Sequence, residues 1–214
     1  MRIDHLVWYD ANLEQGRGFF AERLAAAPAF GGSHPGEGTA NYLASLGDDT
    51  YLEILGRDPA QADASLDSEI AALAGSGLYH WACGGIPISD LAARAEAAGL
   101  PCSISAGGRV KPDGTRLDWT CLGVRGHEYG ALVPFFIDWH ETVHPARSTP
   151  RGGSIVEFVA VSPRPASLKA IYDALGVDVA VEQGPTAGIV ATIESASGRL
   201  MLRSFAPLPR GYVI

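Results

Sequence analysis

The chain has 214 residues, of which 47% are hydrophobic and 19% are charged, so general disorder is excluded and a sizeable core can form. Its 24 acidic and 16 basic residues give a net charge of −8, which argues against nucleic acid and anionic membranes as main partners, because phosphate contacts need a basic face. A small-molecule substrate or a protein partner is compatible with this balance.

The sequence also bears on the compartment of the protein. No stretch approaches about 18 uninterrupted apolar residues, so no membrane span is expected. The N-terminus enters an apolar run without a cationic leader, which favours a cytoplasmic protein. Three cysteines, Cys83, Cys102 and Cys121, lie in apolar strand-like runs, and their odd number favours buried free thiols over a disulfide framework.

The predicted elements recur three times in the order strand, helix, strands. The first unit is predicted to contain a strand at 2–9, a helix at 12–26 capped by Asn12, a glycine-rich loop at 31–41, and strands at 39–46 and 50–56. The second unit is predicted to contain a strand at 79–86, a helix capped by Ser89 that runs to residue 100, and strands at 102–110, 116–124 and 131–139. The third unit is predicted to contain a strand at 154–161, a helix from Ser167, and strands at 178–182, 188–195 and 198–205.

The first strands of these units start about 75 residues apart, which indicates an internal repeat of βαβββ units. The sequence therefore predicts an α+β fold of repeated βαβββ modules, the third of them incomplete. We expect a domain over residues 1–140, with modules at 1–57 and 78–140, and a third module at 154–205. Residues 57–77, with a short helix, form the predicted linker between the first two modules.

Polar residues interrupt three of the predicted strands. His5 shares a strand face with Ile3, Val7 and Tyr9, because side chains alternate along a strand. Glu53 lies within the strand YLEIL, where an unpaired carboxylate carries a large desolvation cost. His80 has a place in the second unit like that of His5 in the first. Two imidazoles and a carboxylate could converge on one zinc, iron, nickel or manganese ion, or each could be a hydrogen-bonded group in a core.

Other candidates lie in turns and later strands. The loop 31–41 can bring backbone close to a ligand, and it offers His34 and Asn41; the alternative is a turn whose glycines serve only backbone geometry. If Arg109 faces a cavity, its planar fork would suit a substrate carboxylate, whereas on the outer face it is a solvated charge. Aromatic residues of later strands could wall a pocket or belong to the core. They are Trp119, Phe135, Phe136 and Trp139.

Four segments of the first unit resemble the first module of a glyoxalase-like domain protein of the vicinal oxygen chelate superfamily. They are IDHLVWY, NLEQGRGFFAERL, GGSHPGEGTAN and YLEILG. HWACGGIPISDLAARAEAAGL resembles the start of the second module, and GGRVKPDGTRLDW and LVPFFIDW complete the likeness. The resemblance implies paired modules that curl into an open barrel around a metal ion.

The resemblance assigns the metal to His5, Glu53 and His80. A fourth ligand is expected in LVPFFIDW, where this chain has Phe135 and Phe136 at mid-strand and Asp138 as the nearest acid. That departure weighs against the metal, and a site without one is compatible with the superfamily. Nucleophilic catalysis and dinucleotide binding have little support, because no Gly-x-Ser-x-Gly motif is present and no GxGxxG follows a strand.

Two functions follow as hypotheses. In the first, a divalent ion chelates a small substrate through two neighbouring oxygens, in an isomerase, lyase or dioxygenase. Glu53 is then a ligand or base and His34 an acid–base group, while Asn41, Arg109, Trp119 and Phe136 contact the substrate. In the second, a metal-free protein binds a small apolar or aromatic compound. The third module is expected to lack catalytic residues and to cover a sheet face or pair with a second copy, which favours a homodimer.

Overall fold

The computed structural model describes residues 1–110 and 114–211 of the chain, and it contains three successive βαβββ runs. The first run comprises β1 (Arg2–Asp10), α1 (Leu13–Ala21), β2 (Ala29–His34), β3 (Thr39–Ser45) and β4 (Tyr51–Arg57). The second comprises β5 (Ser76–Gly84), α3 (Ile88–Ala97), β6 (Cys102–Val110), β7 (Arg116–Val124) and β8 (Phe135–Asp138). The third comprises β9 (Ser154–Ser162), α4 (Pro165–Leu175), β10 (Ala180–Gln183), β11 (Gly188–Ser195) and β12 (Gly198–Arg203).

Short helices lie in the connections: the 3₁₀ helices η1 (Pro59–Gln61), η2 (Gly130–Leu132) and η3 (Pro145–Arg147), and the α-helix α2 (Ser68–Ala72).

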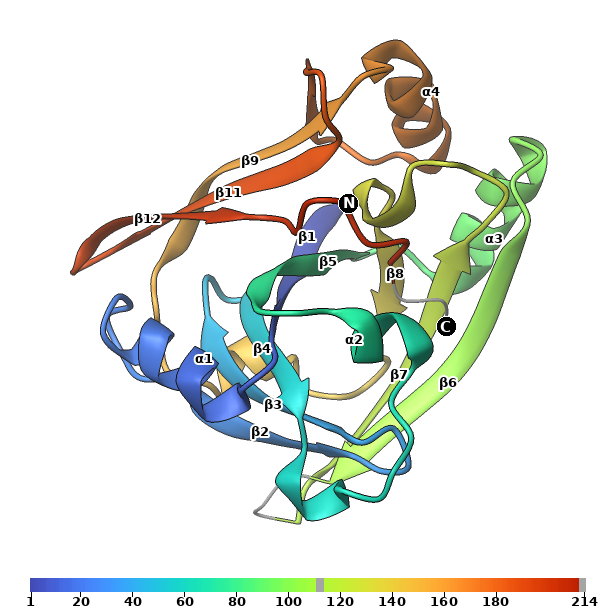
Figure 1. Ribbon diagram of the computed structural model, residues 1–214. Helices are drawn as coiled ribbons and strands as arrows, with labels where there is room; N and C mark the ends of the chain where they lie inside the picture. The colour runs from blue at the N-terminus through green and yellow to red at the C-terminus, as the bar shows by residue number, and fades with distance from the viewer. Residues whose placement is uncertain (111–113, 212–214) are drawn as a thin grey trace.

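The first two runs form one curled sheet of eight strands in the order β2-β3-β4-β1-β5-β8-β7-β6 (Figure 1). In each run the first strand pairs in parallel with the last, β1 with β4 and β5 with β8, and the antiparallel pair β1–β5 joins the two halves. The curl brings the outermost strands β2 and β6 together. Their approach is seen at Gly32, where an added Cβ would lie 2.9 Å from Nη1 of Arg109. The predicted curled mixed sheet of βαβββ modules is thereby confirmed.

The sheet has an outer face and an inner face, each with its own apolar cluster. The outer cluster includes Leu6, Trp8, Trp81 and Phe136 and is covered by α1, α3 and the third run. The inner cluster includes Val7, Tyr9, Tyr51 and Phe135, with Ile70 of α2 packed into it. The inner face is therefore the one that can enclose a site, and the outer face is the main core.

The third run has the predicted order of elements but a different pairing. Its sheet has the order β10-β9-β11-β12, so that β9 pairs with the first strand after its helix and not with the last. This sheet packs on the outer face of the larger one: the ring centroid of Phe158 lies 4.7 Å from that of Trp81, and Ala160, Ile189 and Ile193 join the outer cluster. Figure 1 shows α4 beside α3.

Several predicted boundaries were wrong. The segment 31–41 is a hairpin and not a loop, because β2 ends at His34 and pairs with β3 despite Gly31 and Gly32, which have low strand propensity. Residues 130–132 form η2 rather than part of a strand, and β8 begins only after Pro134.

Two further single-residue predictions fail. Helix α3 begins at Ile88, one residue before the expected cap Ser89, and has no side-chain cap. Cys102 is exposed, whereas Cys83 and Cys121 are buried, and all three thiols are free. Cys102 is the first residue of an outermost strand, which explains its exposure.

The segment after β12 crosses the inner side of the second module. Leu78 O accepts from Phe205 N, and Pro209 O accepts from Ala131 N. At the end of the described chain, Gly211 lies so close to His80 that an added Cβ would be 2.2 Å from its Nε2. This segment buries His80, and burial lowers the pKa of that imidazole to about 4.

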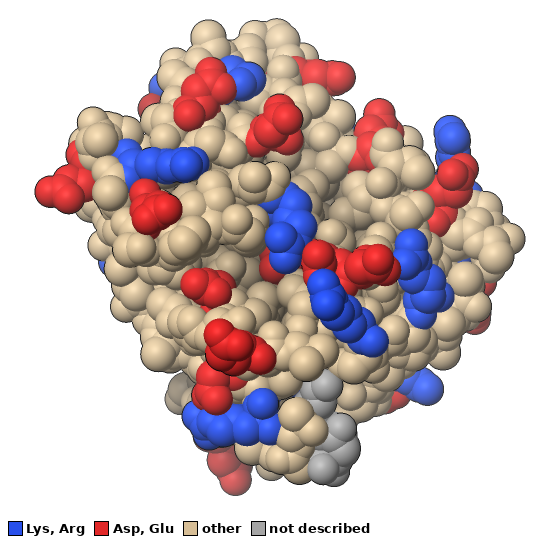
Figure 2. All heavy atoms as spheres, turned by 180° about the vertical axis from the view of Figure 1, so that it is seen from behind, with Lys and Arg blue, Asp and Glu red and all other residues tan. Residues whose placement is uncertain are grey.

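The surface carries charges of both signs. On the face shown in Figure 2, acidic and basic side chains are interspersed, and neither sign forms one continuous patch over the described residues. No described helix is long and apolar enough to cross a membrane.

We predict that Tyr172→Phe destabilises the protein by about 1–3 kcal/mol, because Leu132 O accepts a hydrogen bond from the buried hydroxyl and would lose its partner. Urea unfolding followed by circular dichroism measures the change. Tyr129→Phe is the control, because Tyr129 is only half buried, and we expect it to change the free energy by about 0.5 kcal/mol or less. Equal effects of the two variants would contradict the structural role of Tyr172.

We also predict that His80 makes the fold acid-sensitive. Its pKa is about 4 in the folded chain against 6.5 for an ordinary histidine, so the unfolded state binds the proton first as the pH falls. The gap corresponds to about 3 kcal/mol of stability, fully present above pH 6.5 and lost as the pH falls to 4. His80→Gln should flatten this dependence in urea unfolding at several pH values. The exposed control His140→Asn should retain it, and an unchanged slope in His80→Gln would show that His80 is not its source.

Candidate functional site

The inner face of the first module carries a pair of titratable side chains, His5 of β1 and Glu53 of β4. The parallel register places Val7 opposite Glu53 and His5 opposite Tyr51. The His5 ring stacks on the Tyr51 ring at 4.6 Å between centroids, and His5 Nε2 lies 3.7 Å from Glu53 Oε2. Stacking and strand pairing thus hold an imidazole nitrogen and a carboxylate oxygen about 0.8 Å further apart than in a hydrogen bond.

A β-bulge turns a second carboxylate, that of Asp4, toward the same region. The register between β1 and β5 shifts between Ile3 and His5, so that Asp4 and His5 do not face opposite sides as strict alternation requires. Ile3 consequently packs with the outer cluster, and the predicted shared face of Ile3 and His5 is wrong. Val7 and Tyr9 do lie on the inner face with His5.

Asp4 is held by three donors and is 1% exposed. Its Oδ1 lies 2.8 Å from His5 Nδ1, its Oδ2 lies 3.1 Å from His144 Nε2, and Trp139 Nε1 donates to the carboxylate at 3.2 Å. Burial raises the pKa of Asp4, but the hydrogen bonds and charges of His144 and His5 outweigh it and lower the pKa to about 2. Asp4 is therefore an anion that accepts from His5 Nδ1, so that His5 Nε2 is the nitrogen turned toward Glu53.

Glu53 is fixed from the other side by Asn41 of β3. Asn41 Nδ2 donates to Glu53 Oε1 at 2.7 Å and lies 3.2 Å from His34 Nε2, while His34 Nδ1 lies 2.8 Å from Thr39 Oγ1. These contacts define a neutral His34 that donates through Nδ1 and accepts through Nε2. The side chains of Glu53 and His34 are 12% and 16% exposed, so this end of the group reaches solvent.

Arg109 enters the same region from β6, the strand at the opposite end of the sheet. It is 5% exposed, and its Nη1 has no hydrogen-bond partner among the described residues. Burial lowers the pKa of its guanidinium, and negative charge on Tyr51 and Glu53 opposes that effect. Trp119 of β7 is half buried against Trp139, with ring centroids 5.4 Å apart.

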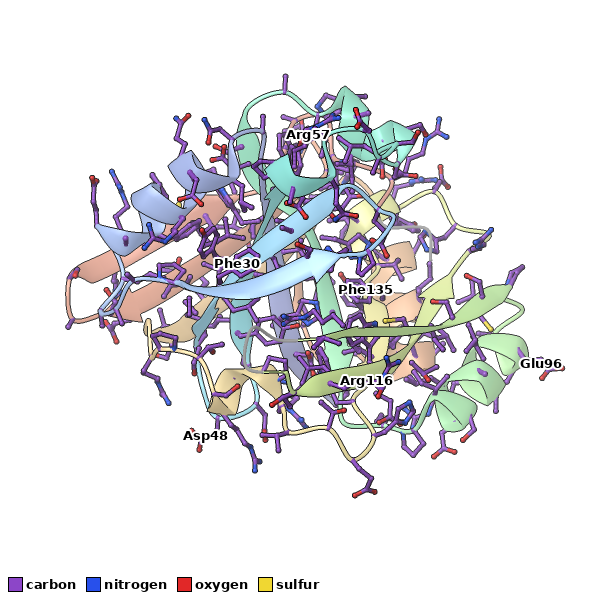
Figure 3. All side chains as sticks on the ribbon, turned by 90° about the horizontal axis from the view of Figure 1, so that it is seen from below. Phe30, Asp48, Arg57, Glu96, Arg116 and Phe135 are labelled. Atoms are coloured by element: carbon purple, nitrogen blue, oxygen red, sulfur yellow. The ribbon has the colours of Figure 1, made fainter. Side chains whose placement is uncertain are left out.

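Figure 3 looks into the curled sheet and shows Phe135 between the strands β2–β3 and the strands β6–β7. Its ring centroid lies 5.3 Å from that of His5 and 5.2 Å from that of His80, so one phenyl group packs against both imidazoles. Phe136, the residue expected at the substrate, is fully buried in the outer cluster, because neighbouring strand residues face opposite sides.

The structure does not unite His80 with His5 and Glu53. Among residues 1–110 and 114–211, no group of three or more histidine, cysteine or acidic side chains could hold a metal ion. His80 Nδ1 lies 3.0 Å from Trp81 O, and the imidazole borders a separate cavity of about 40 Å³, roughly the volume of one water molecule.

The donor set does not fit the expected divalent ion. The residue two positions after His5 pairs with Glu53, whereas the residue two positions after His80 pairs with Phe135, so the second module has a phenyl ring where the first has a carboxylate. One Glu53 oxygen and His34 Nε2 are already engaged with the Asn41 amide. An aromatic ring offers no ligand, so the second module supplies no carboxylate to match Glu53.

Three residues of this group escaped sequence analysis: Asp4, Tyr51 in its contact role, and His144. Asp4 was hidden by the bulge, since alternation assigns it to the opposite face from His5. His144 lies outside the repeated elements and caps η3, and its approach to Asp4 spans 140 positions of the chain. The adjacency of Asp4 to His5 was the one local signal.

Comparison with known proteins supports the fold. The family model described as "Glyoxalase-like domain" matches residues 3–176. A hypothetical protein from Staphylococcus aureus is 15% identical, with 94% of this chain and 84% of that chain covered and a TM-score of 0.65. A mutant 4-hydroxymandelate synthase from Streptomyces coelicolor is 16% identical, with coverage of 94% and 62% and a TM-score of 0.50.

A methylmalonyl-CoA epimerase from Streptomyces coelicolor, in complex with 2-nitronate-propionyl-CoA, is 17% identical over 68% of this chain and 99% of that chain, with a TM-score of 0.47. No curated protein matches. The family match covers most of the chain and includes His5, Glu53 and Arg109. The chain therefore belongs to the glyoxalase-like domain family and has the vicinal oxygen chelate fold.

Proposed function

We propose that this protein is an enzyme that transfers a proton on a small molecule bound against the inner face of the first two modules. The reaction class is an isomerisation or epimerisation that begins with removal of a proton from carbon beside a carbonyl or carboxyl group. The observation that carries this proposal is the sequence of contacts Asp4–His5–Glu53, in which a buried anion directs a free imidazole nitrogen toward a second carboxylate.

Asp4 orients the imidazole ring of His5 and fixes its tautomer. Because Asp4 accepts the Nδ1 proton, Nε2 keeps its lone pair and can receive a proton from the substrate. The negative charge of Asp4 then stabilises the imidazolium that forms. The stacked ring of Tyr51 keeps the imidazole plane fixed during this step.

Glu53 supplies a second group for proton transfer on the same side of the sheet. Asn41 donates a hydrogen bond to Glu53 Oε1, and this bond orients the carboxylate so that Oε2 faces His5. In the proposed reaction the C–H bond breaks, its proton passes to His5 Nε2 or to Glu53, and its electron pair moves into the adjacent carbonyl. Return of a proton to the opposite face of the same carbon completes an epimerisation. If that carbon bears a hydroxyl, transfer of the hydroxyl proton to the enolate oxygen and formation of the new C–H bond at the former carbonyl carbon complete an isomerisation.

The alternative from sequence, a metal-free protein that binds a small compound without reaction, has one specific observation in its favour. Phe135 lies at the position equivalent to Glu53, and it replaces a reactive group with an apolar ring beside both imidazoles. Trp119, half buried nearby, would contribute to such a binding surface. A homodimer and a cytoplasmic location stay predictions from the sequence.

Hydrogen exchange with solvent tests the enzymatic proposal. We expect the wild-type protein in D₂O to exchange the C–H of at least one member of a panel of 2-oxo and 2-hydroxy acids, esters and amides, followed by proton NMR. His5→Gln and Glu53→Gln should each lower the rate by about 100-fold or more. Glu157→Gln, in the third run, is the control and should retain the wild-type rate.

Two outcomes separate the candidates. Equal exchange in the wild type and in both site variants would refute the proposed roles of His5 and Glu53. Binding of a panel member by the wild type without any exchange would favour the metal-free binding protein.

A further inference from the structure

Two buried polar atoms near Glu53 lack partners among the described residues: Nη1 of Arg109 and Oδ1 of Asn41. We propose that they form the recognition site for a small carboxylate that has a hydrogen-bond donor, a hydroxyl or an amine, on its neighbouring carbon. The carboxylate binds Arg109 and the donor binds Asn41. This inference rests on the proposed function, because it names the class of molecule on which His5 and Glu53 act.

The Arg109 guanidinium calls for an anion. A buried donor without a partner carries a desolvation cost that is larger when the group is charged, so a site of this kind is stable only when something compensates. No carboxylate lies within 4.0 Å of Arg109 in the described part of the chain, although Glu53 acts on it at longer range. A ligand carboxylate would satisfy the free Nη1 and bring the charge that the guanidinium lacks.

Asn41 calls for a donor. Its amide orientation follows from its contacts, since Nδ2 donates to Glu53 Oε1 and lies beside His34 Nε2, both of them acceptors. Oδ1 is therefore a bare acceptor, and a carboxylate alone cannot satisfy it. A hydroxyl or amine on the adjacent carbon of the ligand can.

The position of both atoms is set by two consecutive glycines of β2. A Cβ on Gly31 would lie 2.2 Å from Asn41 Oδ1, and a Cβ on Gly32 would lie 2.9 Å from Arg109 Nη1. Gly32 also has φ of +145°, which favours glycine. The backbone of β2 thus lies against both groups, so the Arg109 guanidinium is held beside the strand and does not move freely as a surface side chain would.

Binding of an anion here also assists the proposed chemistry. A carboxylate near Glu53 and His5 adds negative charge. That charge favours the protonated form that either group takes when it accepts the substrate proton. When the substrate loses its proton, the electron pair spreads into the ligand carboxylate, and the positive charge of Arg109 stabilises the added negative charge. The same contact therefore selects the substrate and stabilises the charge that develops.

Calorimetric titration of the full chain with four matched probes tests the recognition site. The probes are lactate, alanine, propionate without the donor, and lactamide without the charge. Lactate or alanine should bind, and we expect lactamide and propionate to bind about tenfold more weakly or worse. Lactate against alanine decides between the hydroxyl and the amine.

Arg109→Lys should weaken lactate or alanine about tenfold and leave lactamide unchanged, because lysine cannot reproduce the planar fork. Two results would overturn the proposal: equal affinity for lactamide and for lactate or alanine, or no binding of either lactate or alanine. Arg109 would then have only the structural role of packing β6 against β2. These probe comparisons in the wild type stand even if Arg109→Lys fails to fold.

Glu53→Gln separates this inference from the proposed function. It should still bind lactate or alanine while hydrogen exchange is lost. If the wild type binds the carboxylate and exchanges nothing, the enzymatic proposal fails and the recognition site stands. If exchange proceeds equally on charged and neutral compounds, the enzymatic proposal stands and the recognition site fails.

Discussion

The antiparallel pairing of β1 with β5 is the constraint on which the rest of the structure depends. It joins two four-stranded halves into one sheet, and it sets His5 and His80 on adjacent central strands. The same pairing puts β2 and β6 at the two ends of the sheet, where the curl brings them together at Gly32 and Arg109. Both of its register shifts lie close to one of these histidines, so the join determines which polar groups turn inward.

The buried charges of the inner face differ in how completely they are satisfied. Asp4 has three donors on its two oxygens, and its low pKa records that the folded chain stabilises the anion. Arg109 is almost as deeply buried and has a donor with no partner. This contrast agrees with a scaffold role for Asp4 and with the recognition role that we propose for Arg109.

The sequence predicted what depends on local patterns. Period-two alternation located most strands and placed Glu53 on one face with Tyr51 and Leu55. The recurrence of element order gave the repeated βαβββ units, and the family resemblance implied their curled sheet. It failed where a long-range contact overrides the pattern. The bulge at Asp4 depends on pairing with β5, β2 forms despite two glycines because β3 lies beside it, and the topology of the third run depends on which neighbour β9 meets.

The candidate site was predicted in part for the same reason. His5, Glu53, Asn41 and His34 come from one module, and the structure links them through one chain of contacts, because β1, β3 and β4 are neighbours. His80 comes from the other module, and there local likeness misled. A histidine at the equivalent strand position meets a different partner strand, and the side chain offered by that strand decides what the histidine can do.

The two modules share a backbone pattern and divide the chemistry between them. Glu53 and Phe135 hold equivalent positions, and Asn41 pairs with the residue two after Glu53 as Cys121 pairs with the residue two after Phe135. The carboxylate and amide of the first module thus become a phenyl ring and a thiol in the second. A symmetric metal centre would need both halves to supply ligands, whereas proton transfer needs its base and carboxylate on one side only. The second module is then free to contribute the apolar wall at Phe135 and, across the curled sheet, the cation of Arg109.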